Sequence, residues 1–484
     1  MTYTITGYQP ERLFHFFEEI SAIPRGSSNE KGISDYLVEF AKARGLWCHQ
    51  DELYNVVIKK PASAGAENKP AVMLQGHLDM VCEKLAGVAH DFEKDGIDLI
   101  VQDGVVTANG TTLGGDNGAA VALMMTVLDD DSLTHPALEC VFTTQEETGL
   151  TGASGLDKSL ISARTMINLD SEEEGIATVS CAGGMRFTMT RPVTRRSVSG
   201  KLLRVSVAGL LGGHSGTDID KERQNGIILL ARLVNRVLHS TQAQLALFQG
   251  GSKDNAIPRE VEAVLVCSPA EIEKAESIAR SLAADFADEL LPFEPDFTCA
   301  VSVSDGTAEV VSEADARAFI SAICLAPNGV RRRNIKQDGF VVTSLNLGVA
   351  RLGDTDAVLV FAPRSSVASL QEDTKDRLYL LAETFGFDCD ISGAYPGWSF
   401  AEHSPIRDTF VASYHDLFGT ELKIEALHAG LECGLFSDAL PGLDAIAVGP
   451  TIRGCHTPDE YLPLDSFARF YTLLTDVLAR LAKR

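Results

Sequence analysis

The sequence predicts an α/β protein with a discontinuous first domain, residues 1–186 and 396–484, and an inserted α+β domain, residues 187–395. Three observations support this prediction. The chain has 484 residues, which is more than one hydrophobic core normally serves. Strand-like and helix-like segments alternate before residue 187 and again after Trp398. Between these two parts the order of the expected elements changes, as an inserted domain would require.

Hydrophobic periodicity defines the elements of the first domain. Residues 10–40 place apolar side chains at helical spacing, and the break at Pro24–Ser28 divides them into two expected helices. The other expected elements are strands at Leu53–Lys59, Ala71–Gln75, Ala137–Thr144, Thr165–Leu169 and Ala445–Gly449, and helices at Gly118–Leu128 and Leu464–Leu481. Because these strands alternate with helices, we expect a mixed, mainly parallel sheet.

The inserted domain is predicted to contain two similar sets of elements. The first set includes the helix Gly226–His239, the strand Val261–Cys267 and the helix Pro269–Leu290. The second set comprises the helix Ala314–Cys324, the strands Val341–Val349 and Ala357–Phe361, the helix Gln371–Phe385 and the strand Phe387–Ile391. This recurrence indicates a duplicated α+β unit, although the two halves share little sequence.

The composition is that of a globular protein with a strong negative charge. Hydrophobic residues make up 45% of the chain, and 42 Lys and Arg against 67 Asp and Glu give a formal net charge of −25. Such acidity disfavours binding to nucleic acid or to an anionic membrane. The ten cysteines form no CxxC pair, and the first residues do not follow the pattern of a secretory signal. We therefore expect reduced thiols and a cytoplasmic protein.

Five short segments carry acidic or imidazole side chains, and the first is Met73–Met80. An expected strand ends at Gly76, and His77 and Asp79 follow two residues apart, so both point to the same side of an extended chain. His77 is a candidate metal ligand whose ring Asp79 would orient. Taken alone this pattern is weak, because a loop histidine beside a surface aspartate would look the same.

The second segment, residues 111–120, surrounds Asp116 with glycines just before an expected helix. Glycines allow the backbone to approach a ligand closely. A helix cap made by Asp116 or Asn117 is the alternative. A phosphate-binding loop is disfavoured because the segment lacks the Gly-x-x-x-x-Gly-Lys-Ser/Thr pattern.

Two further segments place carboxylates at the ends of expected strands. Residues 143–149 contain the adjacent Glu146 and Glu147, whose side chains would point apart, so that one can bind a metal while the other acts as general base or acid. A solvated acidic turn is the alternative for this pair. Residues 167–171 place Asp170 at the end of an apolar strand.

The fifth segment, residues 448–460, places His456 after a glycine-rich loop that follows an expected strand. In open α/β sheets the carboxyl ends of the strands line the binding crevice, so these segments would converge. Two histidines and three carboxylates form a mixed nitrogen and oxygen set that suits zinc or a similar metal. Five ligands are too many for one catalytic zinc and suffice for two metals if one carboxylate bridges them.

Taken together, these segments resemble those of the bacterial aminoacyl-histidine dipeptidases, a carnosinase-like family of di-zinc metallopeptidases. The motifs that carry the resemblance are GHLDMVCEK, GTTLGGDNG, TTQEETGLTG, INLDSEEEG and GCHTPDE. The resemblance covers the whole chain and implies a homodimer whose inserted domain acts as a lid and mediates dimer formation. It also implies small dipeptide substrates, including Xaa-His dipeptides and β-alanyl-histidine.

The resemblance assigns the metal ligands residue by residue. His77 and Asp170 would hold one Zn²⁺, Glu147 and His456 would hold the other, and Asp116 would bridge both through a carboxylate that precedes a cis peptide bond. The implied cofactor is therefore two Zn²⁺ per chain. Co²⁺ or Mn²⁺ could occupy the same ligands.

The resemblance also assigns the residues that act on the substrate. Glu146 would be the general base and acid, and Asp79 would fix the ring of the first histidine ligand. In the inserted domain, His214 would bind the tetrahedral oxyanion and Asn255 would contact the oxyanion or the substrate backbone. Arg364 would bind the C-terminal carboxylate of the substrate. A simple turn is the alternative for His214, and a solvated surface charge is the alternative for Arg364.

Two other functions are compatible with parts of this pattern. A deacylase of N-acyl amino acids would keep every metal ligand and differ in the substrate pocket, but the long inserted domain favours a dipeptidase. A non-catalytic binding protein should have lost the base or a ligand. This second alternative is disfavoured because Glu146 and all the ligand positions are occupied.

Overall fold

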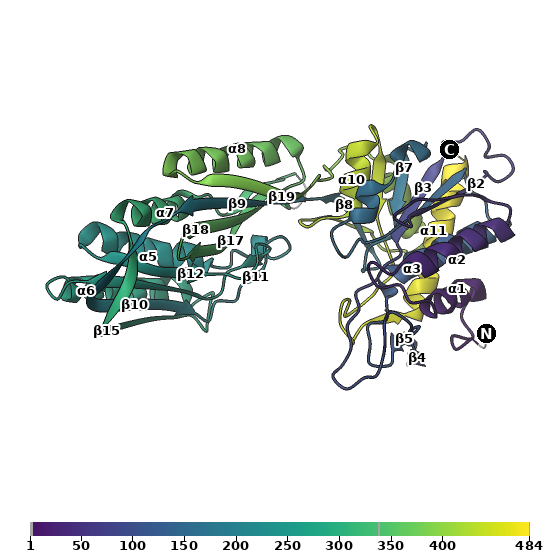
Figure 1. The fold of residues 1–484 in the computed structure, drawn as a ribbon. Helices are drawn as coiled ribbons and strands as arrows, with labels where there is room; N and C mark the ends of the chain where they lie inside the picture. Colours follow the sequence, from purple (N-terminus) through teal and green to yellow (C-terminus); the bar gives the residue numbers. More distant parts are fainter. Residues whose placement is uncertain (1–2, 337–338, 484) are drawn as a thin grey trace. The chain divides into compact units, whose positions relative to one another are not determined.

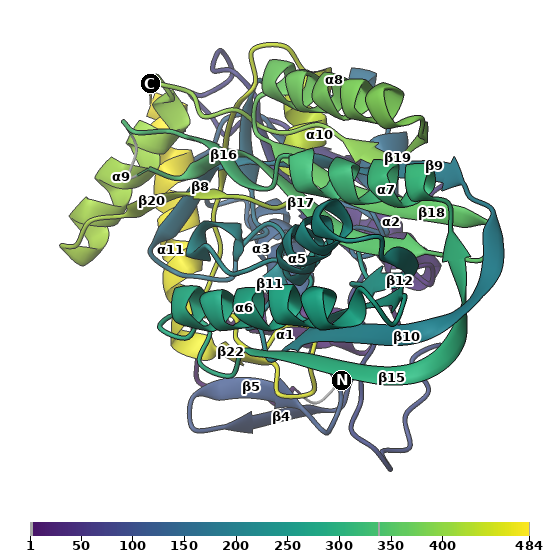
Figure 2. The same cartoon turned by 90° about the vertical axis from the view of Figure 1, so that its left-hand side faces the viewer.

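The computed structural model describes residues 3–336 and 339–483, which form two compact units (Figure 1). Figure 2 shows the same helices and strands from a second direction. Unit 1 comprises Met1–Cys181, Trp398–Leu427 and Leu431–Arg484, and unit 2 comprises Ala182–Gly397 and His428–Gly430. Unit 2 therefore extends a few residues beyond the expected range 187–395, because its strand β9 already begins at Gly183. The short segment 428–430 also belongs to unit 2, where the Ala182 N–H donates a hydrogen bond to the Ala429 carbonyl.

A mixed sheet of eight strands forms the centre of unit 1, counted over the residues described above. Its strands in spatial order are β1 (Trp47–Gln50), β2 (Val56–Lys60), β6 (Leu138–Thr143), β3 (Val72–His77), β7 (Thr165–Asn168), β21 (Asp444–Ala447), β8 (Ile176–Cys181) and β20 (Lys423–Leu427). The inner strands β6, β3, β7 and β21 pair in parallel, whereas β1, β2 and β6 pair antiparallel. The predicted mixed α/β sheet is thereby confirmed.

Helices cover both faces of this sheet. The inner strands β3 and β6 are buried along their whole length, which explains why they read as continuous apolar runs rather than alternating ones. On one face Leu74 and Phe142 pack with the larger core, and on the other Met73 and Val141 pack with the smaller one. The helices of the larger core are α1 (Glu11–Ser21), α2 (Lys31–Ala43), α3 (Gly115–Asp129), α9 (Pro405–Phe418) and α11 (Leu464–Lys483); α4 (Thr151–Gly155) and α10 (Glu432–Ala439) belong to the smaller one.

The parallel inner strands end at the same edge of the sheet. β3 ends at His77, β6 ends three residues before Glu146, and β7 ends two residues before Asp170. The helix α3 is assigned from Gly115, but Asp116 and Asn117 have non-helical backbone angles, so regular helix follows them, as the expected helix Gly118–Leu128 predicted. Unit 1 also contains a small sheet that the sequence did not predict, formed by β4 (Leu99–Gln102), β5 (Val105–Ala108) and β22 (Tyr461–Pro463).

Unit 2 is an antiparallel sheet with helices, and its two halves have the same internal order. One half is β10 (Arg195–Ala208), α5 (Gly226–Ser240), β12 (Gln244–Gly250), β14 (Val261–Cys267), α6 (Ile272–Leu290) and β15 (Thr298–Val311). The other is β9 (Gly183–Pro192), α7 (Glu313–Leu325), β17 (Val341–Leu352), β18 (Asp356–Ser365), α8 (Ala368–Phe385) and β19 (Asp388–Tyr395). In each half the strands lie in the spatial order fourth, first, third, second, and the two halves meet at β12 and β17. This arrangement agrees with the duplication that the sequence indicated.

Unit 2 also contains three shorter strands. β11 (Gly213–His214) pairs with β13 (Ala256–Ile257), and β16 (Gly329–Arg333) pairs with β17. The ten cysteines are free thiols. In the part of the chain that the structure describes, no helix is long and apolar enough to cross a membrane.

Candidate metal centre

His77 is the best buried of the predicted ligands, with a side chain that is 1% exposed at the end of β3. Its Nε2 atom lies 3.1 Å from Asp116 Oδ1 and 3.4 Å from Asp170 Oδ1. Its Nδ1 atom lies 3.1 Å from the carbonyl oxygen of Asp79 and 3.4 Å from the Asp79 carboxylate. The Asp79 side therefore fixes one nitrogen of the ring, and the other nitrogen faces two carboxylates.

Asp79 connects this histidine to the loop that follows β6. Its carboxylate accepts hydrogen bonds from the backbone N–H groups of Glu146 and Glu147 and from the Ser27 hydroxyl, at 3.0, 3.3 and 2.8 Å. Burial raises the pKa of Asp79, but its contact with His77 and these hydrogen bonds outweigh burial and lower that pKa. Asp79 is therefore an anion that holds two parts of the site in fixed positions.

Asp116 lies between the two histidines. Its Oδ1 faces His77, and its Oδ2 lies 3.3 Å from Nε2 of His456. The peptide bond from Asp116 to Asn117 is cis, as the resemblance implied. Possible ligand atoms of His77, Asp116 and Asp170 lie within 4.8 Å of one another, and so do those of Asp116, Glu147 and His456. Asp116 is common to these two groups, which is the geometry of a bridging carboxylate, and it also forms a third group with Glu172 and Cys455.

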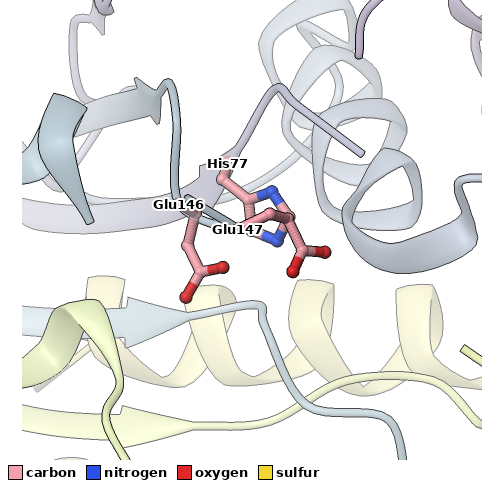
Figure 3. Close-up of side chains that lie close together, drawn as sticks. All are labelled: His77, Glu146 and Glu147. Atoms are coloured by element: carbon pink, nitrogen blue, oxygen red, sulfur yellow. The ribbon is translucent and has the colours of Figure 1, made fainter. Parts of the chain in front are cut away.

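The adjacent Glu146 and Glu147 diverge, as their positions after an extended strand predicted. Figure 3 shows their carboxylates on either side of the His77 ring, and the three residues form a further group of possible ligands. Glu147 Oε1 lies 3.0 Å from Nε2 of His456, yet it is a buried atom without a hydrogen-bond partner of acceptable geometry among the described residues. Burial raises the pKa of Glu146 to about 9, with Asp170 and other nearby carboxylates adding to the effect and His77 opposing it.

The ligand set has the chemistry of a cation site. Its contacts with the carboxylates of Asp116 and then Glu147 raise the pKa of His456 to about 11, so these carboxylates strongly favour a nearby positive charge. Burial raises the pKa of Asp170, and the neighbouring carboxylates Asp116 and Glu147 raise it further. Close, buried carboxylates that form no ion pair with a described lysine or arginine, together with imidazole nitrogens, fit two divalent transition-metal ions.

Two residues that sequence reasoning did not select hold the Asp116 loop. Both oxygens of the buried Glu460 accept hydrogen bonds, from Leu113 N–H and Gly114 N–H on one side and from Gly115 N–H and Asp116 N–H on the other. Arg25 donates to the carbonyl oxygens of Leu78, Asp79 and Gly114. Glu460 stands four residues after His456 in the motif GCHTPDE, and this position could have identified it as a site residue. Arg25 lies in the turn between the first two helices, where no sequence pattern marks it.

The predicted substrate-binding residues lie in unit 2, where they form their own cluster. His214 is the register partner of Ala256, and the Ser215 N–H donates to the Asn255 carbonyl, so His214 and Asn255 are neighbours. Nδ1 of His214 accepts hydrogen bonds from the backbone N–H groups of Gly216 and Thr217 at 3.3 and 3.2 Å. Burial lowers the pKa of His214, and Arg364 lowers it further, so the ring is neutral with its proton on Nε2.

Arg364 lies on β18 and is 8% exposed. Its guanidinium donates to the Tyr395 hydroxyl at 2.9 Å, and its NH2 group lies 3.5 Å from Nε2 of His214. Because that histidine nitrogen also carries a proton, two donors point toward one region of unit 2. A region that receives two N–H donors, one of them charged, favours an anionic oxygen.

Comparison with known proteins gives consistent results along the chain. The model of peptidase family M20/M25/M40 matches residues 73–480. The chain is 36% identical over 472 residues to the cytosol non-specific dipeptidase of Escherichia coli K12, covering 97% of both proteins. It superposes on the crystal structure of aminoacylhistidine dipeptidase from Vibrio alginolyticus with a TM-score of 0.93, 35% identity and coverage of 98% of this chain and 97% of that one. A tripeptidase from Staphylococcus aureus, at 17% identity and a TM-score of 0.56 over 98% of this chain and 99% of that one, shares the fold.

Proposed function

We propose a mechanism and a substrate range on the premise that this chain belongs to peptidase family M20/M25/M40. The chain is a peptide-bond hydrolase that cleaves dipeptides in a metal-dependent reaction. Beyond this, its substrates are unblocked dipeptides, with Xaa-His dipeptides and β-alanyl-histidine among them. The name of the Vibrio relative, an aminoacylhistidine dipeptidase, supports this range. The name of the E. coli relative supports a cytoplasmic location and a broad specificity.

The metal centre is proposed to hold two Zn²⁺ ions in the ligand set of unit 1. His77 and Asp170 would hold one, Glu147 and His456 would hold the other, and Asp116 would be shared between them. The observation that carries this proposal is that Asp116 is shared between two groups of three ligands. Divalent ions in such a site lower the pKa of a water molecule and stabilise the negative charge that develops on the carbonyl oxygen of the substrate.

Glu146 is the proposed general base and acid. It is not needed as a ligand, its carboxylate lies beside His77, and burial raises its pKa. A carboxylate with a raised pKa can take a proton from water during attack on the peptide carbonyl and return it to the leaving amine. Asp79 positions a metal ligand and the general base, because it contacts the His77 ring and accepts a hydrogen bond from the backbone N–H of Glu146.

In unit 2, His214, Asn255 and Arg364 are proposed to bind the substrate. The proton on His214 Nε2 suits donation to the oxyanion, and the Arg364 guanidinium suits the C-terminal carboxylate. Arg364 forms no ion pair with a carboxylate in the described ranges, so its charge is available to an anionic ligand. Recognition of a carboxylate near the scissile bond would restrict the enzyme to very short peptides.

We further propose that the protein is a homodimer assembled through the inserted domain, as the family resemblance suggests. Size-exclusion chromatography with light scattering tests this directly. A mass of one 52.0 kDa chain in solution would contradict it.

The decisive experiment for the function combines metal analysis with hydrolysis assays. The purified protein is analysed by mass spectrometry for bound metal and assayed with β-alanyl-histidine, other unblocked dipeptides and N-acetyl amino acids, before and after chelation. We expect about two zinc ions per chain, cleavage of the unblocked dipeptides, and loss of activity on chelation that added metal restores. Preferential cleavage of the N-acetyl amino acids would identify a deacylase instead, and metal-independent cleavage would overturn the proposal.

A further inference from the structure

A buried carboxylate that the mechanism does not use lies beneath the metal centre. Glu432 is the first residue of α10, and its side chain is 0% exposed. Its Oε2 atom accepts hydrogen bonds from the side-chain amide of Gln75 on β3 and from the hydroxyl of Thr143 on β6, the latter at 2.7 Å. Glu432 therefore connects α10 to the two central strands of the unit 1 sheet.

These contacts continue to the metal ligands. Gln75 Oε1 accepts a hydrogen bond from Asn168 Nδ2 at 2.6 Å, and Asn168 Oδ1 accepts one from the backbone N–H of Asp170 at 3.3 Å. Gln75 stands two residues before His77 on β3, and Thr143 is the register partner of His77 on β6. A single hydrogen-bonded layer thus spans β6, β3 and β7 directly below the residues that carry the ligands.

Within the described residues, Glu432 forms no ion pair with a lysine or an arginine. Its Oε1 atom is buried and has no hydrogen-bond partner among residues 3–336 and 339–483. The nearby Lys158 donates its ammonium hydrogens to the carbonyl oxygens of Ala153 and Ser154 instead. Burial raises the pKa of Glu432 to about 7, Asp170 and Asp79 add to this, and His77 and Thr143 oppose it.

A buried anion beside other anions is unfavourable unless a strong positive charge lies close by. Two divalent ions at the ligands above would supply that charge. Partners behind the direct ligands orient them and tune metal affinity, and their removal typically weakens metal binding about 10–100-fold.

We infer that Glu432 is a positioning residue of the metal centre, which aligns the strand ends through Gln75, Thr143 and Asn168 and whose negative charge strengthens metal binding. The inference rests on the proposed two-metal function of the same site. It differs from a purely structural role, in which Glu432 would act only as a hydrogen-bond acceptor. In that case removal of its charge with retention of an acceptor oxygen would leave metal affinity unchanged.

The test compares Glu432→Gln with Glu139→Gln. Glu139 is a matched control, because it is a 3% exposed carboxylate at the opposite end of β6 that accepts hydrogen bonds from Lys59, Ser162 and Ala163. Each full-length variant is stripped of metal and titrated with Zn²⁺ in competition with a chromophoric chelator. Far-UV circular dichroism checks the fold of the metal-free proteins.

We expect Glu432→Gln to lower the Zn²⁺ affinity of at least one position about 10–100-fold, and Glu139→Gln to leave both positions unchanged. The metal-free Glu432→Gln protein should be at least as stable as the unmodified one, because a buried charge beside Asp170 has been removed, and its gain in melting temperature on Zn²⁺ addition should be smaller. Unchanged Zn²⁺ affinity in Glu432→Gln overturns the inference.

A second variant covers the case in which Glu432→Gln does not fold. Thr143→Val removes one hydrogen bond to Glu432 and keeps the charge, and it should also weaken Zn²⁺ binding; unaltered binding would contradict the positioning role. Zn²⁺ binding by the unmodified protein separates failure of the proposed two-metal function from failure of the role proposed for Glu432. If it binds no Zn²⁺, the proposed function fails, whereas two tightly bound ions with insensitive variants would refute only the role of Glu432.

Discussion

Glu460 offers the sharpest quantitative test of how the site is held together. Its two oxygens accept hydrogen bonds from the N–H groups of Leu113 and Gly114, at 2.8 and 2.9 Å, and of Gly115 and Asp116, at 2.8 and 3.2 Å. Glu460→Gln replaces one oxygen by an NH2 group, which then faces two N–H donors in a site that is 2% exposed. Each buried donor left without a partner costs about 1–3 kcal/mol, so the substitution should destabilise unit 1 by about 2–6 kcal/mol.

The assay can report on unit 1 alone. Both tryptophans, Trp47 and Trp398, lie in unit 1, so their fluorescence during urea unfolding follows that unit. The measurement is made in chelator to remove the contribution of metal binding, and Zn²⁺ affinity is then measured separately. The exposed neighbour Asp459 provides the control, since Asp459→Asn removes the same charge without disturbing the loop.

The expected result is a lower free energy of unfolding and weaker Zn²⁺ binding for Glu460→Gln, because the loop that carries Asp116 loses its anchor. Asp459→Asn should match the unmodified protein in both measurements. A destabilisation of less than about 1 kcal/mol with unchanged Zn²⁺ affinity would refute the reasoning, since it would mean that these four donors find other partners.

Four other predictions follow from the same structure. Glu146→Gln should lower kcat about 10²–10⁴-fold with two metal ions retained, measured by kinetics and metal analysis; retained activity would exclude it as the base. Asp116→Ala should lose metal at both positions, unlike Asp131→Ala, which alters a 95% exposed side chain. Arg364→Ala should raise KM for dipeptides about 10–100-fold, from the loss of about 1.5–3 kcal/mol of charged hydrogen bonding, and equal cleavage of dipeptide amides by the unmodified enzyme would contradict this role. Burial lowers the pKa of His428 to about 3, with Arg364 contributing, so the folded state holds this proton more weakly than the unfolded chain, whose histidine pKa is about 6.5. The free energy of unfolding should therefore fall by about 1.4 kcal/mol for each pH unit below 6.5. Urea unfolding followed by circular dichroism, with His428→Asn as the reference protein, measures this fall.

Local patterns were sufficient to predict most of the elements and the ligand types. The mostly apolar run before His77 predicted a buried strand, and β3 is indeed covered on both faces. The adjacent Glu146 and Glu147 had to diverge, because neighbouring side chains on extended backbone point apart. The short strands β4, β5 and β22 were not predicted, since three or four residues give too little pattern to recognise.

Contacts between residues far apart in the sequence required the tertiary structure. Glu460 and Asp116 are separated by 344 residues, and Glu432 and Gln75 by 357 residues, so no local pattern reports these hydrogen bonds. The same holds for the three residues 428–430, which leave unit 1 to join unit 2. The sequence by itself selected the candidate ligand side chains that the fold brings together, because strand ends and glycine-rich turns mark them locally. Only the fold decided which buried groups hold those side chains in place, because that depends on where distant strands and helices pack.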